Sequence, residues 1–201
     1  MMTRVSYFVA VFVLAGVALA QTEFSADMAD TTKGTQAKIY MAKDKVRFEP
    51  AEKGQHGMGA FIMNLTTQTS TVLMDQQHMY MEMPAQMAAQ RTPYKFFRVD
   101  DVDNACGDWL QQQSNKGGTC HKLGSETVNG RNTVKYEGTN ANGDTGTVWL
   151  DTKLHFPVKW QGKNGGGELR NIQEGSQPAS LFEVPAGYTK FDMGGMMQRP
   201  Q

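Results

Sequence analysis

The sequence predicts a mainly β (α+β) fold, in which a curved antiparallel sheet or incomplete β-barrel of about ten to eleven strands carries a helical insert over its concave face. Short stretches of alternating apolar residues recur along the chain, as at Val134 and Tyr136. Turn sequences such as Asn129-Gly130 separate these stretches at short intervals, which indicates antiparallel neighbours. Residues 84–116 interrupt this rhythm with helix formers and two prolines, which predicts one insert.

The N-terminus has the pattern of a secretory signal peptide. Arg4 precedes an apolar run from Phe8 to Leu19, which is short for a membrane span. The small residues Ala18 and Ala20 mark a cleavage site before Gln21. We therefore expect residues 1–20 to be removed and the protein to lie in the periplasm or outside the cell. A single domain is expected over residues 21–192, followed by a disordered tail at 193–201.

The charge balance argues against nucleic acid as a partner. Without Arg4, the 20 basic residues become 19, against 20 acidic residues, which gives a formal net charge of −1. Such a chain offers no basic footprint for nucleic acid or an anionic membrane surface. We expect a monomer that is not an integral membrane protein once the signal peptide is cleaved.

The N-terminal half is expected to form a meander of short strands. Ile39 with Met41, and Val46 with Phe48, alternate on either side of a turn at Lys43-Asp44, which is a hairpin pattern. Residues 53–59 form a glycine-rich loop. Further strands are expected at 60–65, 71–74 and 78–83, joined by turns at 66–70 and 75–77.

The insert is expected to contain two helical stretches. Pro84 is a favourable first helical residue, residues 85–90 are rich in helix formers, and Pro93 interrupts them. A second short helix over 104–114 would begin at Asn104 and end before Gly117-Gly118.

The two cysteines, Cys106 and Cys120, are expected to form a disulfide. Export would place them where disulfides persist, and the chain between them is long enough to turn back on itself. Closing a loop of about 15 residues would stabilise the fold by roughly 3 kcal/mol. A metal site that includes the adjacent His121, and a pair of free thiols, are the alternatives.

Strands resume after Cys120. They are expected at 122–128, 132–138, 147–151, 156–161, 168–173 and 181–184. Phe156, Val158 and Trp160 share one face of their strand. Pro157 has no amide to donate, so it fits the start of a strand or an edge.

Three blocks in this half carry a family resemblance. They read KLGSETVNGRNTVKYEG, GTVWLDTKLHFPVKW and ELRNIQEGSQPASLFEVPAGY, beginning at Lys122, Gly146 and Glu168. The chain resembles the DUF4412 group of exported bacterial proteins, which is similar to the LolA-like superfamily of lipoprotein carriers. The resemblance implies an incomplete barrel with helices across its open face, which encloses an apolar space for acyl chains.

Common catalytic motifs are missing from the sequence. It contains no G-x-S-x-G, H-E-x-x-H, P-loop, G-x-G-x-x-G or C-x-x-C pattern. The four histidines are scattered, and the aspartates at 100, 101, 103 and 108 lack the regular spacing of a calcium loop. We expect no enzyme activity, no cofactor and no dedicated metal site.

Methionine is the unusual residue of this chain. Met79, Met81 and Met83 alternate along one strand beside His78. Thioether sulfurs suit Cu(I), but same-face residues on a strand lie about 6.5–7 Å apart. Methionines also occupy other expected strands, where flexible side chains adapt to irregular apolar partners.

Three functional hypotheses follow. The first is a non-enzymatic carrier or binding protein that holds a lipid acyl chain, a lipoprotein acyl chain or another apolar small molecule in the concavity. Candidate lining residues are Phe61, Met63, Met79, Met81 and Met83. The second is a methionine-rich periplasmic Cu(I)-binding protein. The third is a structural envelope-interaction domain with a filled core and no ligand.

Overall fold

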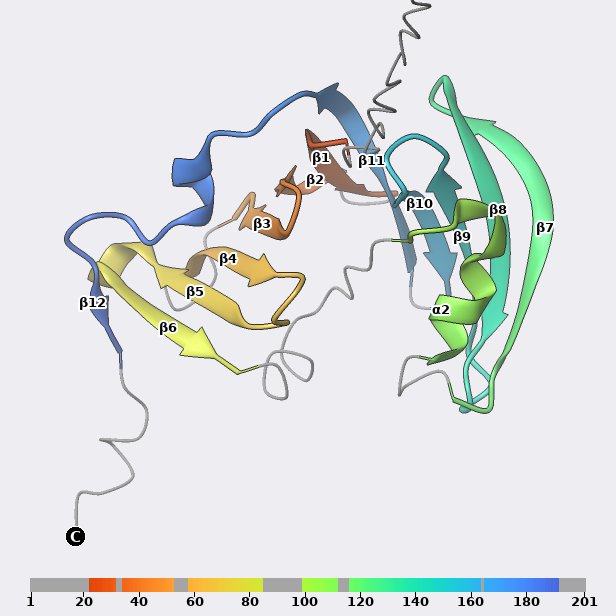
Figure 1. Cartoon of the computed structure of the whole chain (residues 1–201), viewed down its shortest axis with the longest axis horizontal. Helices are drawn as coiled ribbons and strands as arrows, with labels where there is room; N and C mark the ends of the chain where they lie inside the picture. Colours follow the sequence, from red (N-terminus) through yellow and green to blue (C-terminus); the bar gives the residue numbers. More distant parts are fainter. Residues whose placement is uncertain are drawn as a thin grey trace, which may run out of the picture.

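The computed structural model describes residues 22–31, 34–52, 58–84, 99–111, 116–163 and 165–191. A 12-stranded sheet dominates this part of the chain, in the order β12-β6-β5-β4-β3-β2-β1-β11-β10-β9-β8-β7 (Figure 1). The strands are β1 Phe24–Asp30, β2 Gly34–Met41, β3 Lys45–Pro50, β4 Met58–Asn64, β5 Ser70–Met74, β6 Met79–Met83, β7 Thr119–Val128, β8 Arg131–Thr139, β9 Thr145–Asp151, β10 Phe156–Gly162, β11 Gly165–Glu174 and β12 Thr189–Lys190. The expected fold class is confirmed.

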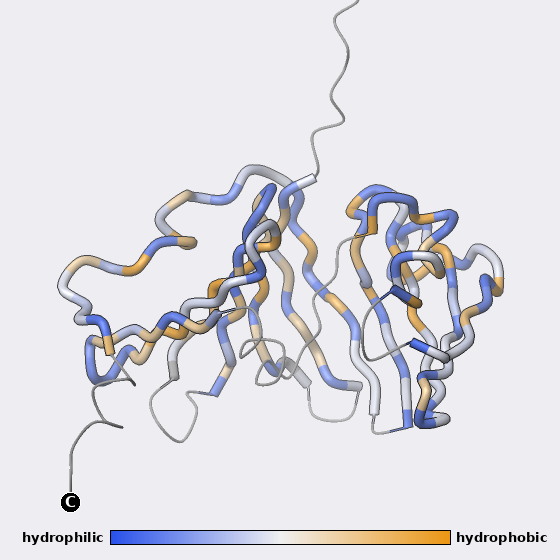
Figure 2. The backbone as a smooth tube through the Cα atoms, turned by 60° about the horizontal axis from the view of Figure 1, so that its bottom comes forward, coloured by the Kyte–Doolittle hydropathy of each residue, from blue (hydrophilic) through white to orange (hydrophobic). Residues whose placement is uncertain are grey.

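The sheet curves into an open arch, with the N-terminal half (β12 and β6 to β1) on one side and the C-terminal half (β11 to β7) on the other (Figure 1). Strand β1 joins the halves because it pairs with both β2 and β11. All neighbours are antiparallel except β12 and β6. Apolar and polar stretches alternate along both halves of the arch (Figure 2), as strands with two differently used faces require.

The turns follow local sequence chemistry where the sequence predicts them. Asn129 and Gly130 both have positive φ, at 50° and 78°, between β7 and β8. Asparagine and glycine tolerate this conformation better than other residues, so this two-residue hairpin is well specified.

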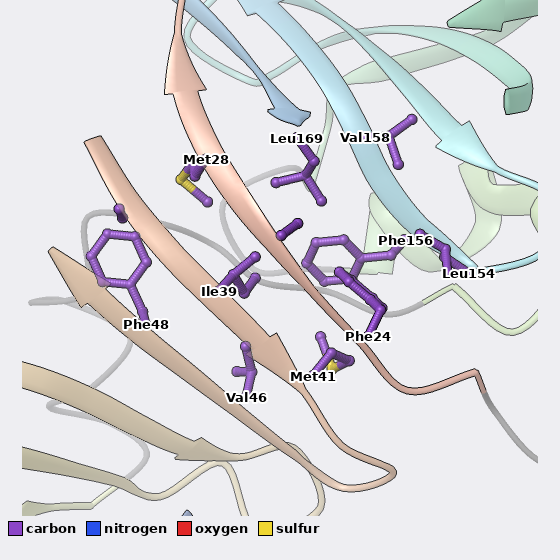
Figure 3. Close-up of a cluster of buried hydrophobic side chains, with 12 residues drawn as sticks. Phe24, Met28, Ile39, Met41, Val46, Phe48, Leu154, Phe156, Val158 and Leu169 are labelled. Carbon is purple, nitrogen blue, oxygen red and sulfur yellow. The ribbon is translucent and has the colours of Figure 1, made fainter. Parts of the chain in front are cut away.

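The main core lies on the concave face, which we call the inner face. Phe24, Ile39, Met41 and Leu169 are buried there together (Figure 3). Phe24 meets Phe156 edge-on, with ring centroids 5.6 Å apart. This cluster joins β1 to β3 of the N-terminal half with β10 and β11 of the C-terminal half.

The strand expected at 181–184 is wrong. Residues Ala179–Phe182 form a 3-10 helix, η4, and the last strand is the two-residue β12. Phe182 is buried on the outer face of β4 and β5, against Ala60, Ile62 and Leu73. The apolar residues of this segment are therefore buried on top of the sheet rather than within it, and Arg47 Nη1 holds the segment by donating to the Leu181 carbonyl at 2.8 Å.

The sequence places Met28 in a strand without bounds, and this strand is β1, which together with β12 raises the strand number to twelve. Its residues are buried on both faces near the middle of the arch, since Ala26 and Ala29 are as buried as Phe24. A strand buried on both faces shows no clean apolar–polar alternation.

A short helix covers the inner face of the C-terminal half. The 3-10 turn η2, Val102–Asn104, leads into α2, Ala105–Gln111. Asn104, expected to begin the helix, is instead the last residue of η2. Asp101 caps η2 by accepting a hydrogen bond from the Asp103 amide at 3.0 Å. The expected disulfide joins Cys106 of α2 to Cys120 of β7, with the two Cα atoms 5.5 Å apart.

Several predictions concern segments outside the described residues. These are the signal peptide, most of the glycine-rich loop, the helix after Pro84 and the C-terminal tail. They stay predictions.

Candidate functional site

A cavity of about 590 Å³ lies between α2 and the inner face of β8 to β11. Its volume falls within the range of roughly 300–1,000 Å³ that is common for small-ligand sites. Strand β1 contributes Met28 and Asp30 to one side. The cavity therefore lies under the helix, in the C-terminal half.

The floor of the cavity is apolar. Leu150 is fully buried, and Tyr136 and Phe156 are nearly so. Ala105 of α2 packs against this floor. Tyr136 keeps its hydroxyl satisfied by donating to the Val102 carbonyl at 2.8 Å, and this bond ties the floor to the turn before α2. Burial raises the pKa of Tyr136, so the hydroxyl stays protonated and keeps this donor role.

Two tryptophans form the walls, and each rests on a glycine. The Trp109 ring lies so close to Gly138 that a Cβ there would sit 2.9 Å from Cη2. The Trp160 ring lies over Gly167 in the same way, where a Cβ would come within 2.4 Å of Cζ2. Only glycine permits these contacts, because real side-chain atoms would collide with the rings.

A row of glycines crosses the open end of this half. Cross-strand pairing aligns Gly138 with Gly146, Gly146 with Gly162, and Gly162 with Gly165. We call these four residues the glycine row. All four line the cavity. Because they carry no side chains, the inner face is bare backbone at this end.

Polar side chains surround the mouth. Asp144 and Lys163, from the turns after β8 and β10, form an ion pair at 3.5 Å. Asn140 Oδ1 accepts hydrogen bonds from the amides of Asn142 and Asp144, at 2.9 and 3.0 Å, and fixes the first turn. Gln161 is exposed at the same rim. An apolar interior with a few polar groups is the usual arrangement of a small-molecule site.

The opposite end of these strands is closed by charge. Asp151 is buried and pairs with Arg131, which also binds Glu174 at 2.8 Å. Asp151 Oδ1 accepts from the amides of Lys153 and Leu154, both at 2.8 Å, and so shapes the turn before β10. The hydrogen bonds from Lys153 and Arg131 lower the pKa of Glu174.

The five candidate lining residues lie on the inner face of the other half. Phe61 and Met81 pack near Val72 and Met83, and Met83 is buried. Met63 packs against the main core, and Met79 is half-buried beside Met74 in the β5–β6 pairing. Phe61 and Met63 of β4 pair with residues of β5 that in turn pair with Met81 and Met83 of β6. These four candidates therefore share one face of the sheet, as expected. None of the five lines the 590 Å³ cavity.

The sequence predicted that the insert at 84–116 covers the sheet, and α2 lies within that segment. It did not predict which residues line the cavity. Trp109 and Trp160 appeared in the expected helix and strand, without a role. The signal that was available is the glycine at the end of each of four strands. The alignment of these four glycines can be recognised only when the strand register is known.

Within the described residues, no group of three or more His, Cys, Asp or Glu side chains could hold a metal ion. In the same part of the chain, no helix is both long and apolar enough to cross a membrane.

Comparisons with known proteins support the fold. Neither a protein-family model nor a curated protein matches the sequence. An uncharacterized conserved protein from Thermus thermophilus is similar in structure, with a TM-score of 0.53 and 10% identity over 86% of this chain and 91% of that one. That similarity shows a shared fold.

Two further similarities are weaker. The MucA/MucB complex structure from Pseudomonas aeruginosa contains a chain with a TM-score of 0.47 and 12% identity, over 84% of this chain and 57% of that one. A LolA superfamily protein from Nitrosomonas europaea gives a TM-score of 0.30 and 11% identity, over 81% of this chain and 88% of that one. The resemblance to DUF4412 stays a prediction.

Proposed function

We propose that this protein is an exported, non-enzymatic binding protein that holds one apolar group, such as an acyl chain, in the cavity under α2. The observation that carries the proposal is the cavity itself, with its apolar floor, its two indole walls and its polar rim. The LolA-like resemblance of the sequence agrees with it.

The physical driving force is burial of apolar surface. Each Å² removed from water contributes about 25 cal/mol. A hydrocarbon chain lying on Leu150, Phe156 and Val148 would be shielded by α2 on its other side. The disulfide between Cys106 and Cys120 ties α2 to β7 and so fixes the cover over the sheet.

The methionine face belongs to the same proposal as a second apolar surface. Phe61, Met63, Met79, Met81 and Met83 remain our candidates for contacts with a longer guest, on the inner face of the N-terminal half. Met28 lines the cavity and also belongs to the main core between the halves. It therefore supports the hypothesis that a longer ligand could extend from the cavity toward the N-terminal half.

Binding can be tested with decanoate, by tryptophan fluorescence and calorimetry on the mature protein. We expect saturable binding. Val148→Phe should weaken it at least tenfold, because the new ring fills the cavity. Thr127→Phe, on the exposed edge strand β7, is the matched control and should bind as the unaltered protein does.

Native mass spectrometry of the protein purified from a bacterial periplasm separates the rivals. A co-purified lipid mass supports the proposal. A copper adduct that disappears in the Met79/Met81/Met83→Ile triple variant would favour the Cu(I) hypothesis instead. A clean protein mass, together with no decanoate binding, would leave a structural domain and reject the carrier role.

A further inference from the structure

The mouth of the cavity has a geometry that the floor does not explain. An apolar pocket for a chain needs only the floor and the helix above it. At its open end, the sheet also presents the glycine row, flanked by the indoles of Trp109 and Trp160.

The molecule itself shows what sits on bare backbone at this end. Trp109 lies over Gly138 of β8, and Trp160 lies over Gly167 of β11. In both cases a flat ring occupies the space that a side chain would otherwise fill. Glycine in a strand often marks a place where another group approaches the backbone closely.

Between the two indoles, two glycines carry no ring. Gly146 of β9 and Gly162 of β10 are cross-strand partners, so they lie side by side at the mouth. Trp160 belongs to β10, and its ring lies over Gly167 in the next same-face register row. Among the described residues, a Cβ on Gly162 would meet only the backbone oxygens of Thr145 and Gly165, at 3.9 and 4.0 Å. The surface over Gly146 and Gly162 is therefore open, and we call it the ring seat.

The side chains around the ring seat are suited to a hydroxylated ring. Asn140, Asp144 and Lys163 provide both hydrogen-bond donors and acceptors at the rim. A sugar ring presents an apolar C–H face to an indole or to bare backbone and hydroxyl groups around its edge. An aromatic hydrocarbon would leave these rim groups unused.

We propose that the mouth binds a sugar ring, so that the preferred ligand is a glycolipid-like amphiphile with one hydrocarbon chain under α2 and its sugar on Gly146 and Gly162. This inference rests on the proposed function, because it places the head of the same ligand whose chain fills the cavity. It adds a specificity that the apolar floor cannot supply.

One glycine of the row permits a clean test. A Cβ on Gly162 would meet only Thr145 O at 3.9 Å and Gly165 O at 4.0 Å, which are ordinary contacts. A Cβ on Gly138 would collide with Trp109, one on Gly146 would press on Gln161 O at 3.3 Å, and Gly165 has a φ of +119°. Gly162→Leu therefore fills the ring seat without forcing the backbone.

The experiment compares three ligands below their micelle concentrations. Octyl glucoside carries a sugar ring, octyl gluconamide carries the same chain with an open-chain polyol, and decanoate tests the chain alone. We expect octyl glucoside to bind at least tenfold tighter than octyl gluconamide. Gly162→Leu should abolish that preference, because its side chain fills the ring seat, while decanoate binding to the unaltered protein measures the chain site alone.

The matched control is Gly107→Leu, an exposed position on α2 where nothing lies within 4 Å of an added Cβ. It should keep the preference. Trp149 provides an internal reference, because it is buried on the outer face between Lys135 and Lys159. Quenching by octyl glucoside should therefore persist in Trp149→Phe and disappear in the Trp109/Trp160→Phe double variant.

Equal affinity for the two octyl ligands would overturn the inference, as would a preference that survives Gly162→Leu. If decanoate binds in either case, the carrier function stands and only the sugar specificity fails. If decanoate and both octyl ligands fail to bind, the proposed function itself is rejected.

Discussion

The two halves of the arch use the same inner face in opposite ways. In the N-terminal half, one cross-strand row runs through Met83, Ser70, Met63, Val46, Met41 and Phe24. We call this the filled row. In the C-terminal half, the corresponding kind of row is the glycine row. One row carries apolar side chains at five of its six positions, and the other has no side chains.

The outer faces differ in the same sense. In the N-terminal half, η4 and Tyr188 pack an apolar cluster against the outer face. In the C-terminal half, Trp149 on the outer face is held by hydrogen bonding to Glu126 at 2.9 Å and lies under the ammonium groups of two lysines. The N-terminal half is therefore packed from both sides, whereas the C-terminal half depends on α2 as its inner cover.

One curved sheet therefore combines a rigid frame with a binding site. A frame needs dense packing, because a missing methylene group is felt throughout a well-packed core. A site needs space that does not collapse, and here glycines on the sheet and a tethered helix provide it. The two halves are both built of strands, and the side-chain volume along one cross-strand row distinguishes the frame from the binding site.

The largest expected effect is on the cover of the C-terminal half. Replacing both cysteines, Cys106→Ser with Cys120→Ser, should cost about 3 kcal/mol of unfolding free energy, because the bridge closes a loop of 14 residues' separation. Denaturant unfolding measures the change. Decanoate affinity should fall as well, since α2 would lose its anchor to β7.

Unchanged decanoate affinity in a folded double-serine variant would mean that packing alone fixes α2 over the cavity. Reducing the unaltered protein with a mild thiol gives the same comparison without a mutation.

A matched pair of valines should show the difference between the halves directly. Val46 belongs to the filled row and is 1% exposed, whereas Val148 lines the cavity. We expect Val46→Ala to cost about 2–3 kcal/mol, since it removes buried methyl groups and leaves a void. Val148→Ala should cost about 1 kcal/mol, because one side of that valine already faces space.

Thermal or denaturant unfolding of the two variants checks this. Equal losses would mean that the cavity half is packed as tightly as the frame, which would contradict the contrast between the two rows.

Much of the fold was predictable because its signals are local. Alternating residues identified ten of the twelve strands closely enough to place them, and Asn129-Gly130 identified a hairpin. The bounds of β1 could not be predicted because both its faces are buried. The segment at Leu181 and Phe182 was wrongly predicted as a strand because apolar residues packed on a sheet show the same pattern as residues within one.

The site was harder to predict because it depends on register. Gly138, Gly146, Gly162 and Gly165 look like turn or strand-end glycines in the sequence, and their alignment exists only after four strands pair. The alternation of the methionines, in contrast, is a local pattern that the sequence shows directly. The sequence therefore favoured the methionine face over the cavity.

A smaller effect is expected in the filled row. Met83→Leu conserves volume at a buried position, so it should cost less than about 1.5 kcal/mol. Decanoate affinity should stay unchanged for a chain that fits within the cavity, and should change only for longer chains if the methionine face contributes. A copper adduct that depends on Met83 in native mass spectrometry would instead give this row a metal-binding role.

The smallest expected effect concerns the charged end of the C-terminal half, opposite the glycine row. Lys153 and Arg131 lower the pKa of Glu174 from its usual value near 4.5. A lowered folded-state pKa contributes stability that is present above the unfolded value and is lost as the pH falls through the folded value. Glu174→Gln should therefore cost about 0.2–1 kcal/mol at pH 7, the range of partly exposed ion pairs.

The difference between Glu174→Gln and the unaltered protein should shrink toward zero as the pH falls below about 4.5. Urea unfolding at several pH values measures it, with Glu183→Gln, an exposed position after η4, as the control. A difference that persists in acid would show that the glutamine acts through altered packing. A difference that vanishes in acid would show that the ionised Glu174 carboxylate stabilises this end of the strands.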